Sequence, residues 1–173
     1  ASHGVDVGPV GGGGMVRRGA RNTALARAGR PLVLWMRANI ETGVIQPIAQ
    51  IAEIVHAANG ILHVDAVQGA GRIDCDIETL GADLLSLSAH KLGGPQGAGA
   101  LIRRGDIHIA EPLIKGGGHE RGLRAGTEHV AAIAGLGSAW RASASPRPAG
   151  AGPRGGDRVP TGGGAAHAEP ARR

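Results

Sequence analysis

The sequence of 173 residues contains no phenylalanine, no tyrosine, two tryptophans and a single cysteine. The one cysteine, Cys75, excludes an internal disulfide and a zinc cluster built on cysteines, and it fits a reducing compartment. No run of 18 apolar residues is present, so we expect no membrane span. The first residues do not show a positive stretch followed by an apolar one, so no signal peptide is expected. These absences favour a soluble, cytoplasmic protein.

The net charge of +5 comes from the two ends of the chain. Residues 1–31 hold five arginines against one acid, and residues 141–173 hold six arginines against two acids, so each end carries +4. Residues 32–140 hold eight basic residues against eleven acids and carry −3. Because the block with regular structure is acidic, the basic total does not predict a nucleic-acid-binding surface.

Composition divides the chain into three parts. Residues 1–31 are rich in glycine and arginine and predict a weakly structured segment. Residues 141–173 contain Val159 as their only branched aliphatic residue, and such a segment cannot bury enough apolar surface to become ordered. Residues 32–140 remain as the folded domain. The abrupt change at both ends indicates a partial or frame-shifted product of a longer coding sequence.

Four short apolar runs alternate with helical patterns in the central block. The runs predict strands over residues 32–36, 61–65, 83–87 and 97–103. The helical patterns predict a helix between Pro47 and Gly60, a short helical turn over 77–81, and a final helix over 128–140 that Thr127 caps. We interpret His56 as a solvated helix residue and His63 as a half-buried strand residue.

The connections between these elements predict the fold. Strand, helix and strand in succession give parallel strands joined by a right-handed crossover. Residues 93–95, Gly-Gly-Pro, are too short for a helical crossover, so the fourth strand should run antiparallel to the third. The predicted fold is therefore an α/β domain with a mostly parallel sheet, flanking helices and one antiparallel strand.

Polar side chains follow two of the predicted parallel strands. Asp65 ends the second strand, and Ser88, His90 and Lys91 follow the third. Because the carboxyl ends of parallel strands share one edge of a sheet, these groups should converge. A lysine opposite a carboxylate suits pyridoxal phosphate (PLP), since the lysine binds the cofactor and the acid keeps its pyridine nitrogen protonated. Ser88 and His90 can donate to the phosphate, and Gln68 lies within reach.

Two other interpretations of these residues stay open. Asp65 and Lys91 can form an ordinary ion pair at the sheet edge. His63, Asp65 and His90 have the ligand types of a zinc site. We give the zinc site little weight, because we expect His63 and Asp65 to point to opposite faces of their strand.

Four segments resemble a known family in order and spacing. Residues 38–140 resemble the NifS/IscS-type cysteine desulfurases, which are PLP enzymes of aminotransferase class V. The matching segments are Glu41–Pro47, His63–Gln68, Asp83–Lys91 and Gly116–Thr127. The resemblance implies that residues 32–140 form the central part of the large domain of PLP fold type I, in a truncated chain.

The resemblance also implies roles for individual residues. Lys91 matches the Schiff-base lysine, which also moves the α-proton of the substrate. Asp65 matches the acid at the pyridine nitrogen, and Gln68 the amide near the phenolic oxygen. Ser88 and His90 match residues of the phosphate site.

Thr127 matches a threonine that reaches the phosphate of the neighbouring subunit, so the resemblance implies a homodimer. The intact family converts L-cysteine to alanine and an enzyme persulfide, which serves iron–sulfur cluster assembly through scaffold or sulfur-acceptor proteins. A transaminase, a selenocysteine lyase or a non-catalytic fragment are the alternatives.

The sequence departs from the family pattern in ways that bear on activity. Where the family has two asparagines, this chain has Asn39 and Ile40, so one hydrogen bond to the cofactor's phenolic oxygen is absent. No counterpart of the family's N-terminal part is recognised before residue 32. The sulfur-accepting cysteine and the substrate-binding arginine are not found, and we interpret Cys75 as an incidental thiol. We therefore expect weak PLP retention and negligible turnover by this chain alone.

Overall fold

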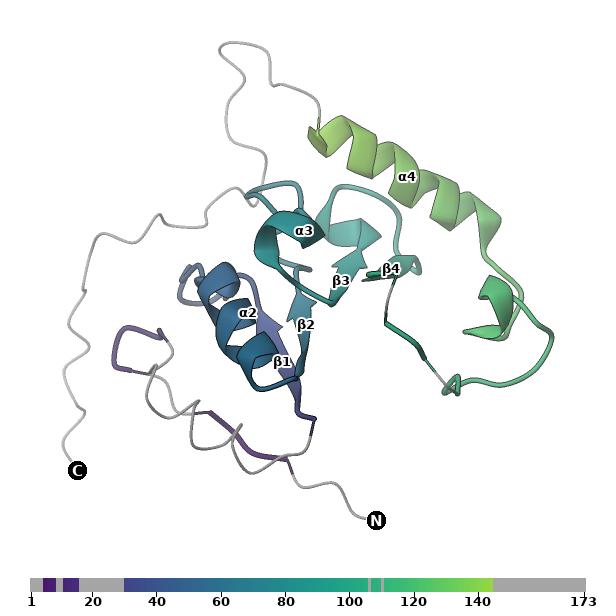
Figure 1. The fold of residues 1–173 in the computed structure, drawn as a ribbon. Coiled ribbons are helices and arrows are strands. Elements are labelled where there is room, and N and C mark those ends of the chain that lie inside the picture. Colours follow the sequence, from purple (N-terminus) through teal and green to yellow (C-terminus); the bar gives the residue numbers. More distant parts are fainter. Residues whose placement is uncertain (1–4, 9–10, 16–29, 106, 110, 145–173) are drawn as a thin grey trace, which may run out of the picture.

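The computed structural model describes residues 5–8, 11–15, 30–105, 107–109 and 111–144. Within these residues a single sheet has the strand order β1-β2-β3-β4 (Figure 1). The strands are β1 (Leu32–Met36), β2 (Ile61–Asp65), β3 (Leu84–Ser88) and β4 (Gly99–Arg103). The first three are parallel, and β4 pairs antiparallel with β3. The predicted topology is confirmed. The strand β3 begins and ends one residue later than predicted, and β4 begins at Gly99 instead of residue 97.

Two helices cover one face of this sheet (Figure 1). They are α2 (Ile48–Ala57) and α3 (Ile77–Leu80). The buried face of α2 follows from apolar residues spaced three and four apart, and it packs on alternate residues of the strands. The largest fully buried side chains of this core are Ile48, Ile51, Val55, Leu62, Val64 and Leu85.

The described residues contain three further helical elements: η1 (Ala89–Lys91) between β3 and β4, and η2 (Glu120–Gly122) and α4 (Val130–Ala144) after β4. The helix α4 begins later and ends later than predicted, and Thr127 does not cap it. Instead, Nδ1 of His129 accepts a hydrogen bond from the backbone N–H of Ala132 at 3.3 Å, which satisfies one of the unpaired donors of the first turn. Residues 141–144 thus extend α4 into the segment predicted to be disordered. Residues 145–173 and most of 1–31 lie outside the described residues.

The other face of the sheet carries the side chains that alternate with the core. Its apolar members on β1 and β4 are exposed: Leu32 59%, Leu34 64%, Met36 45% and Leu101 54%.

His63 and Asp65 both lie on this second face of the sheet, because residues two apart along a strand share a face. The expectation that they point to opposite faces was therefore wrong. Ser86 and Ser88 of β3 lie on the same face, since their neighbours Leu85 and Leu87 belong to the core.

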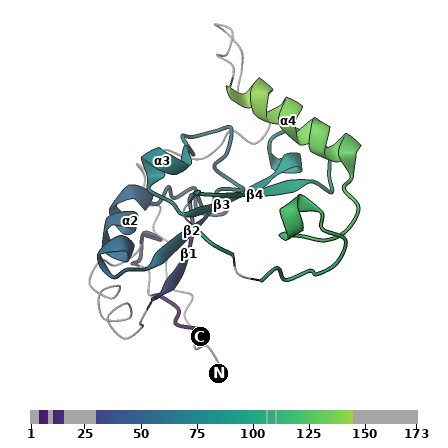
Figure 2. The ribbon, with the colours of Figure 1, turned by 45° about the vertical axis from the view of Figure 1, so that its right-hand side comes forward.

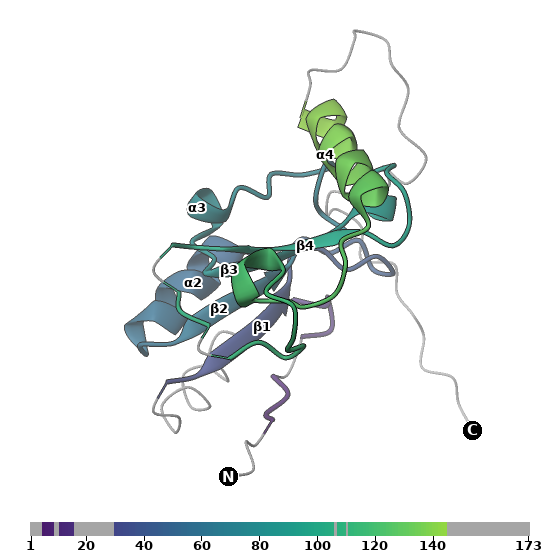
Figure 3. The same cartoon turned by 90° about the vertical axis from the view of Figure 1, so that its right-hand side faces the viewer.

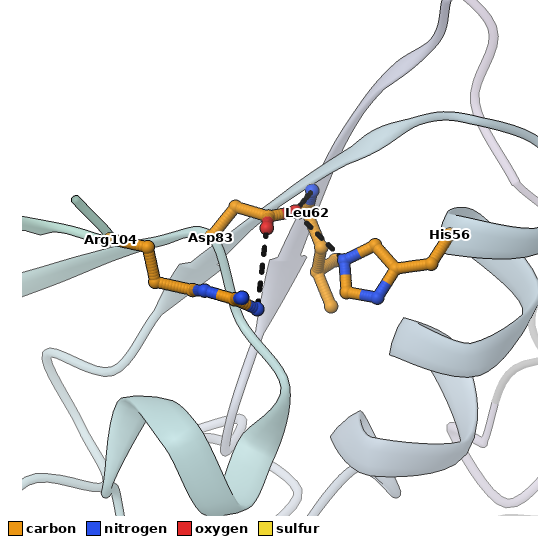
Figure 4. A network of polar contacts seen from close by, with 4 residues as sticks. All are labelled: His56, Leu62, Asp83 and Arg104. Atoms are coloured by element: carbon orange, nitrogen blue, oxygen red, sulfur yellow. Dashed lines mark hydrogen bonds and ion pairs between the residues drawn. The ribbon is translucent and has the colours of Figure 1, made fainter. Parts of the chain in front are cut away.

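A buried carboxylate, Asp83, joins four elements at the amino end of β3 (Figure 4). Its Oδ2 accepts a hydrogen bond from the backbone N–H of Leu62 at 2.8 Å and lies 3.0 Å from Nε2 of His56. Its Oδ1 lies 3.8 Å from Nη1 of Arg104. Its backbone N–H donates to the carbonyl of Leu62 at 2.9 Å, and its carbonyl accepts from the N–H of Arg104 at 3.0 Å. His56 is exposed on α2, as expected of a solvated helix residue, and it also contacts this carboxylate, which was not predicted.

We predict that Asp83→Ala lowers the free energy of unfolding by roughly 1–3 kcal/mol, because it leaves a buried backbone donor without its acceptor. Urea denaturation measures the change. Glu53→Ala on the exposed side of α2 is the control and should change stability by less than about 0.5 kcal/mol. Equal effects of the two substitutions would contradict the role given to Asp83.

Candidate active site

The carboxyl ends of β2 and β3 meet at one edge of the sheet, as predicted. Asp65 is the last residue of β2 and stands level with Ser86 in the parallel register. Ser88 ends β3 two residues further on, and η1 then carries His90 and Lys91. The structure therefore brings the predicted cofactor residues of two neighbouring strands to the same edge.

The Asp65 carboxylate is exposed and is oriented by its own turn. Its Oδ1 accepts a hydrogen bond from the backbone N–H of Val67 at 2.9 Å, which is the geometry of an Asx turn. The half-buried Gln68 follows in the same turn, where its carbonyl accepts from Nη1 of Arg72 at 3.0 Å. These two hydrogen bonds fix the backbone of the turn from which the Asp65 and Gln68 side chains project.

Ser88 and His90 form a pair at the start of the lysine turn. The distance from Oγ of Ser88 to Nδ1 of His90 is 2.9 Å. A hydroxyl and an imidazole held side by side can donate to a phosphate. Lys91 is half-buried at the last position of η1, directly after His90.

The backbone of the lysine turn is fixed from two sides. On one side, the N–H of Ala89 donates to the carbonyl of Ala98 at 3.0 Å, beside β4. On the other side, α4 packs across the turn through glycines (Figure 3). A Cβ on Gly135 would lie 2.6 Å from Cδ of Pro95, and a Cβ on Gly94 would lie 3.1 Å from Cβ of Ala139. This contact was not predicted from the sequence, although a glycine inside a helix is itself a signal of close packing.

Thr127 lies apart from the other predicted residues. It is exposed on the segment between η2 and α4. Figure 2 shows this segment beyond β4, on the side of the sheet away from β1. The structure therefore places Asp65, Gln68, Ser88, His90 and Lys91 at or just after the carboxyl ends of β2 and β3, and Thr127 elsewhere.

The loop after β1 does not replace the absent amide. Oδ1 of Asn39 accepts hydrogen bonds from the backbone N–H groups of Glu41 at 2.9 Å and Thr42 at 3.0 Å. Asn39 therefore caps its own turn, and Ile40 beside it is 64% exposed.

Cys75 is buried, and burial raises the pKa of its thiol to about 11, although the nearby Arg37 partly offsets this rise. It lines a pocket of about 380 Å³ between the loop after β2 and the end of α4. The thiol is therefore protonated at neutral pH, and only the thiolate is a strong nucleophile. This supports the interpretation of Cys75 as an incidental thiol.

The zinc alternative fails in the part of the chain that the structure describes, because no group of three or more histidine, cysteine, aspartate or glutamate side chains there could hold a metal ion. His63 instead contacts Ser86, with 2.7 Å between Nε2 and Oγ. Among the described helices, none has the length and apolar character needed to cross a membrane.

Comparison with known proteins gives consistent matches. The family model described as aminotransferase class-V matches residues 5–145, so the similarity begins earlier than the residue 38 at which we recognised it. The cysteine desulfurase IscS of Glaesserella parasuis serovar 5 is 47% identical over 124 residues, which are 70% of this chain and 30% of that protein.

Solved structures agree with the sequence matches. A NifS-like protein from Rickettsia africae has a TM-score of 0.76 and 41% identity, over 79% of this chain and 38% of the other. A structure titled SspA in complex with cysteine has a TM-score of 0.65 and 36% identity, over 75% of this chain and 37% of the other. The chain thus spans less than a third of the curated relative and under two fifths of the solved structures.

We predict that Gly135→Ala lowers stability, because the added methyl would overlap the Pro95 ring and displace α4 from the lysine turn. Gly137→Ala is the matched control on the same helix, since a Cβ there has its nearest neighbour at 3.6 Å. That variant should raise stability, because alanine favours a helix by up to about 1 kcal/mol over glycine. Thermal melts of the two variants compare them directly. Stabilisation by both substitutions would show that the contact is not tight.

We predict that the Cys75 thiol of the folded chain reacts with iodoacetamide about a hundredfold more slowly at pH 8 than in urea. The reason is that burial, by raising the pKa of Cys75 to about 11, removes most of the thiolate. The rate for the folded chain should keep rising with pH to about that value. Mass spectrometry of timed samples gives the rates. Equal rates with and without urea would show an accessible, activated thiol.

Proposed function

The chain belongs to the aminotransferase class-V family, and we propose that it carries the PLP-binding core of a cysteine desulfurase. The observation that supports this most is the arrangement of two neighbouring strand ends. Asp65 ends β2, and the Ser88–His90 pair and Lys91 follow β3 at the same edge. The donor chemistry suits the cofactor, since a carboxylate, an amine and two groups that can donate to a phosphate come from the same edge of the sheet.

The proposed roles of the residues follow from their chemistry. PLP, when bound, draws electrons from the bonds at the α-carbon of an amino acid. In our proposal Lys91 supplies the amine that binds the cofactor and then moves a proton at the substrate's α-carbon. Asp65 holds a proton on the pyridine nitrogen, Ser88 and His90 donate to the phosphate, and Gln68 approaches the phenolic oxygen.

L-cysteine is the substrate that we propose. The curated relatives carry the name cysteine desulfurase, and one structural neighbour is titled as a complex with cysteine. Transfer of sulfur requires a thiolate, and the protonated Cys75 does not provide one. We therefore propose that this chain alone turns over cysteine at a negligible rate.

The remaining parts of the proposal concern assembly. Thr127 lies exposed on a glycine-rich segment that extends beyond β4, which suits contact with a second subunit of a homodimer. A sulfur-acceptor or iron–sulfur scaffold protein in the cytoplasm would complete the reaction.

The test is retention of PLP itself. The purified chain is mixed with PLP, reduced with borohydride and analysed by mass spectrometry, and we expect one reduced PLP group on Lys91. Lys91→Ala should lose the adduct, whereas Lys115→Ala, the other lysine, should keep it. Labelling at both lysines alike, or none at millimolar PLP, would refute the proposal.

We predict that Ile40→Asn strengthens PLP binding by roughly 1–3 kcal/mol, because it restores a second donor to the phenolic oxygen, which Gln68 alone approaches in our proposal. Titration of the PLP absorbance measures the affinity. Ile40→Ala removes the same alkyl group without adding a donor and should bind PLP as the parent chain does. If Ile40→Ala gained as much as Ile40→Asn, the effect would be steric.

A further inference from the structure

A second imidazole–hydroxyl pair lies next to the proposed cofactor site. Nε2 of His63 on β2 and Oγ of Ser86 on β3 are 2.7 Å apart, and both side chains are half-buried. The pair lies on the sheet face that α2 and α3 do not cover. The roles proposed above involve neither residue.

The position of this pair relates it to the site. His63 precedes Asp65 by two residues on β2, and Ser86 precedes Ser88 by two residues on β3, so all four share one face. The parallel register runs to the pair of Asp65 and Ser86, and the N–H of Ala66 then donates to the carbonyl of Ser86 at 3.1 Å. Beyond this point β2 leaves the sheet, whereas β3 continues beside β4. The hydrogen bond between His63 and Ser86 therefore links β2 and β3 just before the two strands separate.

The separation of these strand ends matters for a rigid ligand. The PLP ring would have to meet Asp65 from one strand while its phosphate meets Ser88 from the other. If the separation between β2 and β3 changed slightly, PLP could keep its contact with Asp65 only by lengthening its contact with Ser88, or the reverse. Groups that bind a rigid ligand act best when neighbouring residues fix their positions. We propose that His63 and Ser86 are positioning residues, whose hydrogen bond sets the spacing between Asp65 and Ser88. This inference rests on the proposed function.

The test measures PLP affinity, by absorbance titration with PLP alone, for the parent chain and its variants. His63→Phe and Ser86→Ala should each raise the Kd for PLP about tenfold, which corresponds to the loss of one hydrogen bond. The variant with both substitutions should bind PLP no more weakly than either single variant, because the two substitutions remove the same interaction. His63→Gln keeps a side-chain donor and should recover part of the affinity. The absorption maximum of the bound cofactor should shift in His63→Phe and in Ser86→Ala.

His56→Phe is the matched control. It also removes an imidazole hydrogen bond, but from Asp83 at the opposite edge of the sheet. It should lower the urea midpoint of unfolding and leave PLP affinity and the absorption maximum unchanged.

The outcomes separate this inference from the proposed function. If His63→Phe and Ser86→Ala lower stability but bind PLP as the parent chain does, the pair is merely structural and the inference is wrong. Additive losses in the double variant would also overturn it. If the parent chain binds no PLP at Lys91, the proposed function fails, and this inference fails with it.

Discussion

The parallel register of β2 and β3 is the constraint on which the rest of the structure depends. At the amino end, the Asp83 carboxylate fixes it by accepting from the Leu62 backbone and contacting His56. At the carboxyl end, the 2.7 Å contact of His63 with Ser86 spans the same two strands. A buried carboxylate is tolerated in a protein only when it is hydrogen-bonded, and several elements supply the partners of the Asp83 carboxylate.

The chemistry at the carboxyl edge follows from this register. A shift by one residue would turn Asp65 toward the α2 side of the sheet and bury a carboxylate in the apolar core. With the observed register, Asp65 and Ser88 share the face that α2 and α3 do not cover, and η1 with Lys91 follows directly after Ser88. The Gly135 contact with Pro95 adds a second restraint, because it holds α4 directly on the lysine turn.

Much of this arrangement could be predicted from the sequence, because strand and helix periodicity reflect burial, and burial decides the sheet order and thereby the edge at which Asp65 and Lys91 lie. The remaining features depend on contacts between distant residues. The His56–Asp83 contact joins residues 27 apart, and nothing near His56 indicates it. The start of α4 was misjudged because threonine is a common cap, whereas here the His129 imidazole accepts the hydrogen bond. The shared face of His63 and Asp65 needed only the two-residue period of a strand, which we misapplied.

The central claim is that the Asp65 carboxylate and the Lys91 amine act on one PLP molecule held between two strand ends. The pyridine nitrogen of the cofactor reports this most directly, because a facing carboxylate keeps it protonated. The measurement is the ¹⁵N chemical shift of ring-labelled PLP bound to the parent chain and to Asp65→Ala. The account predicts a protonated nitrogen in the parent chain and an unprotonated one in the variant. The same protonation state in both would contradict it.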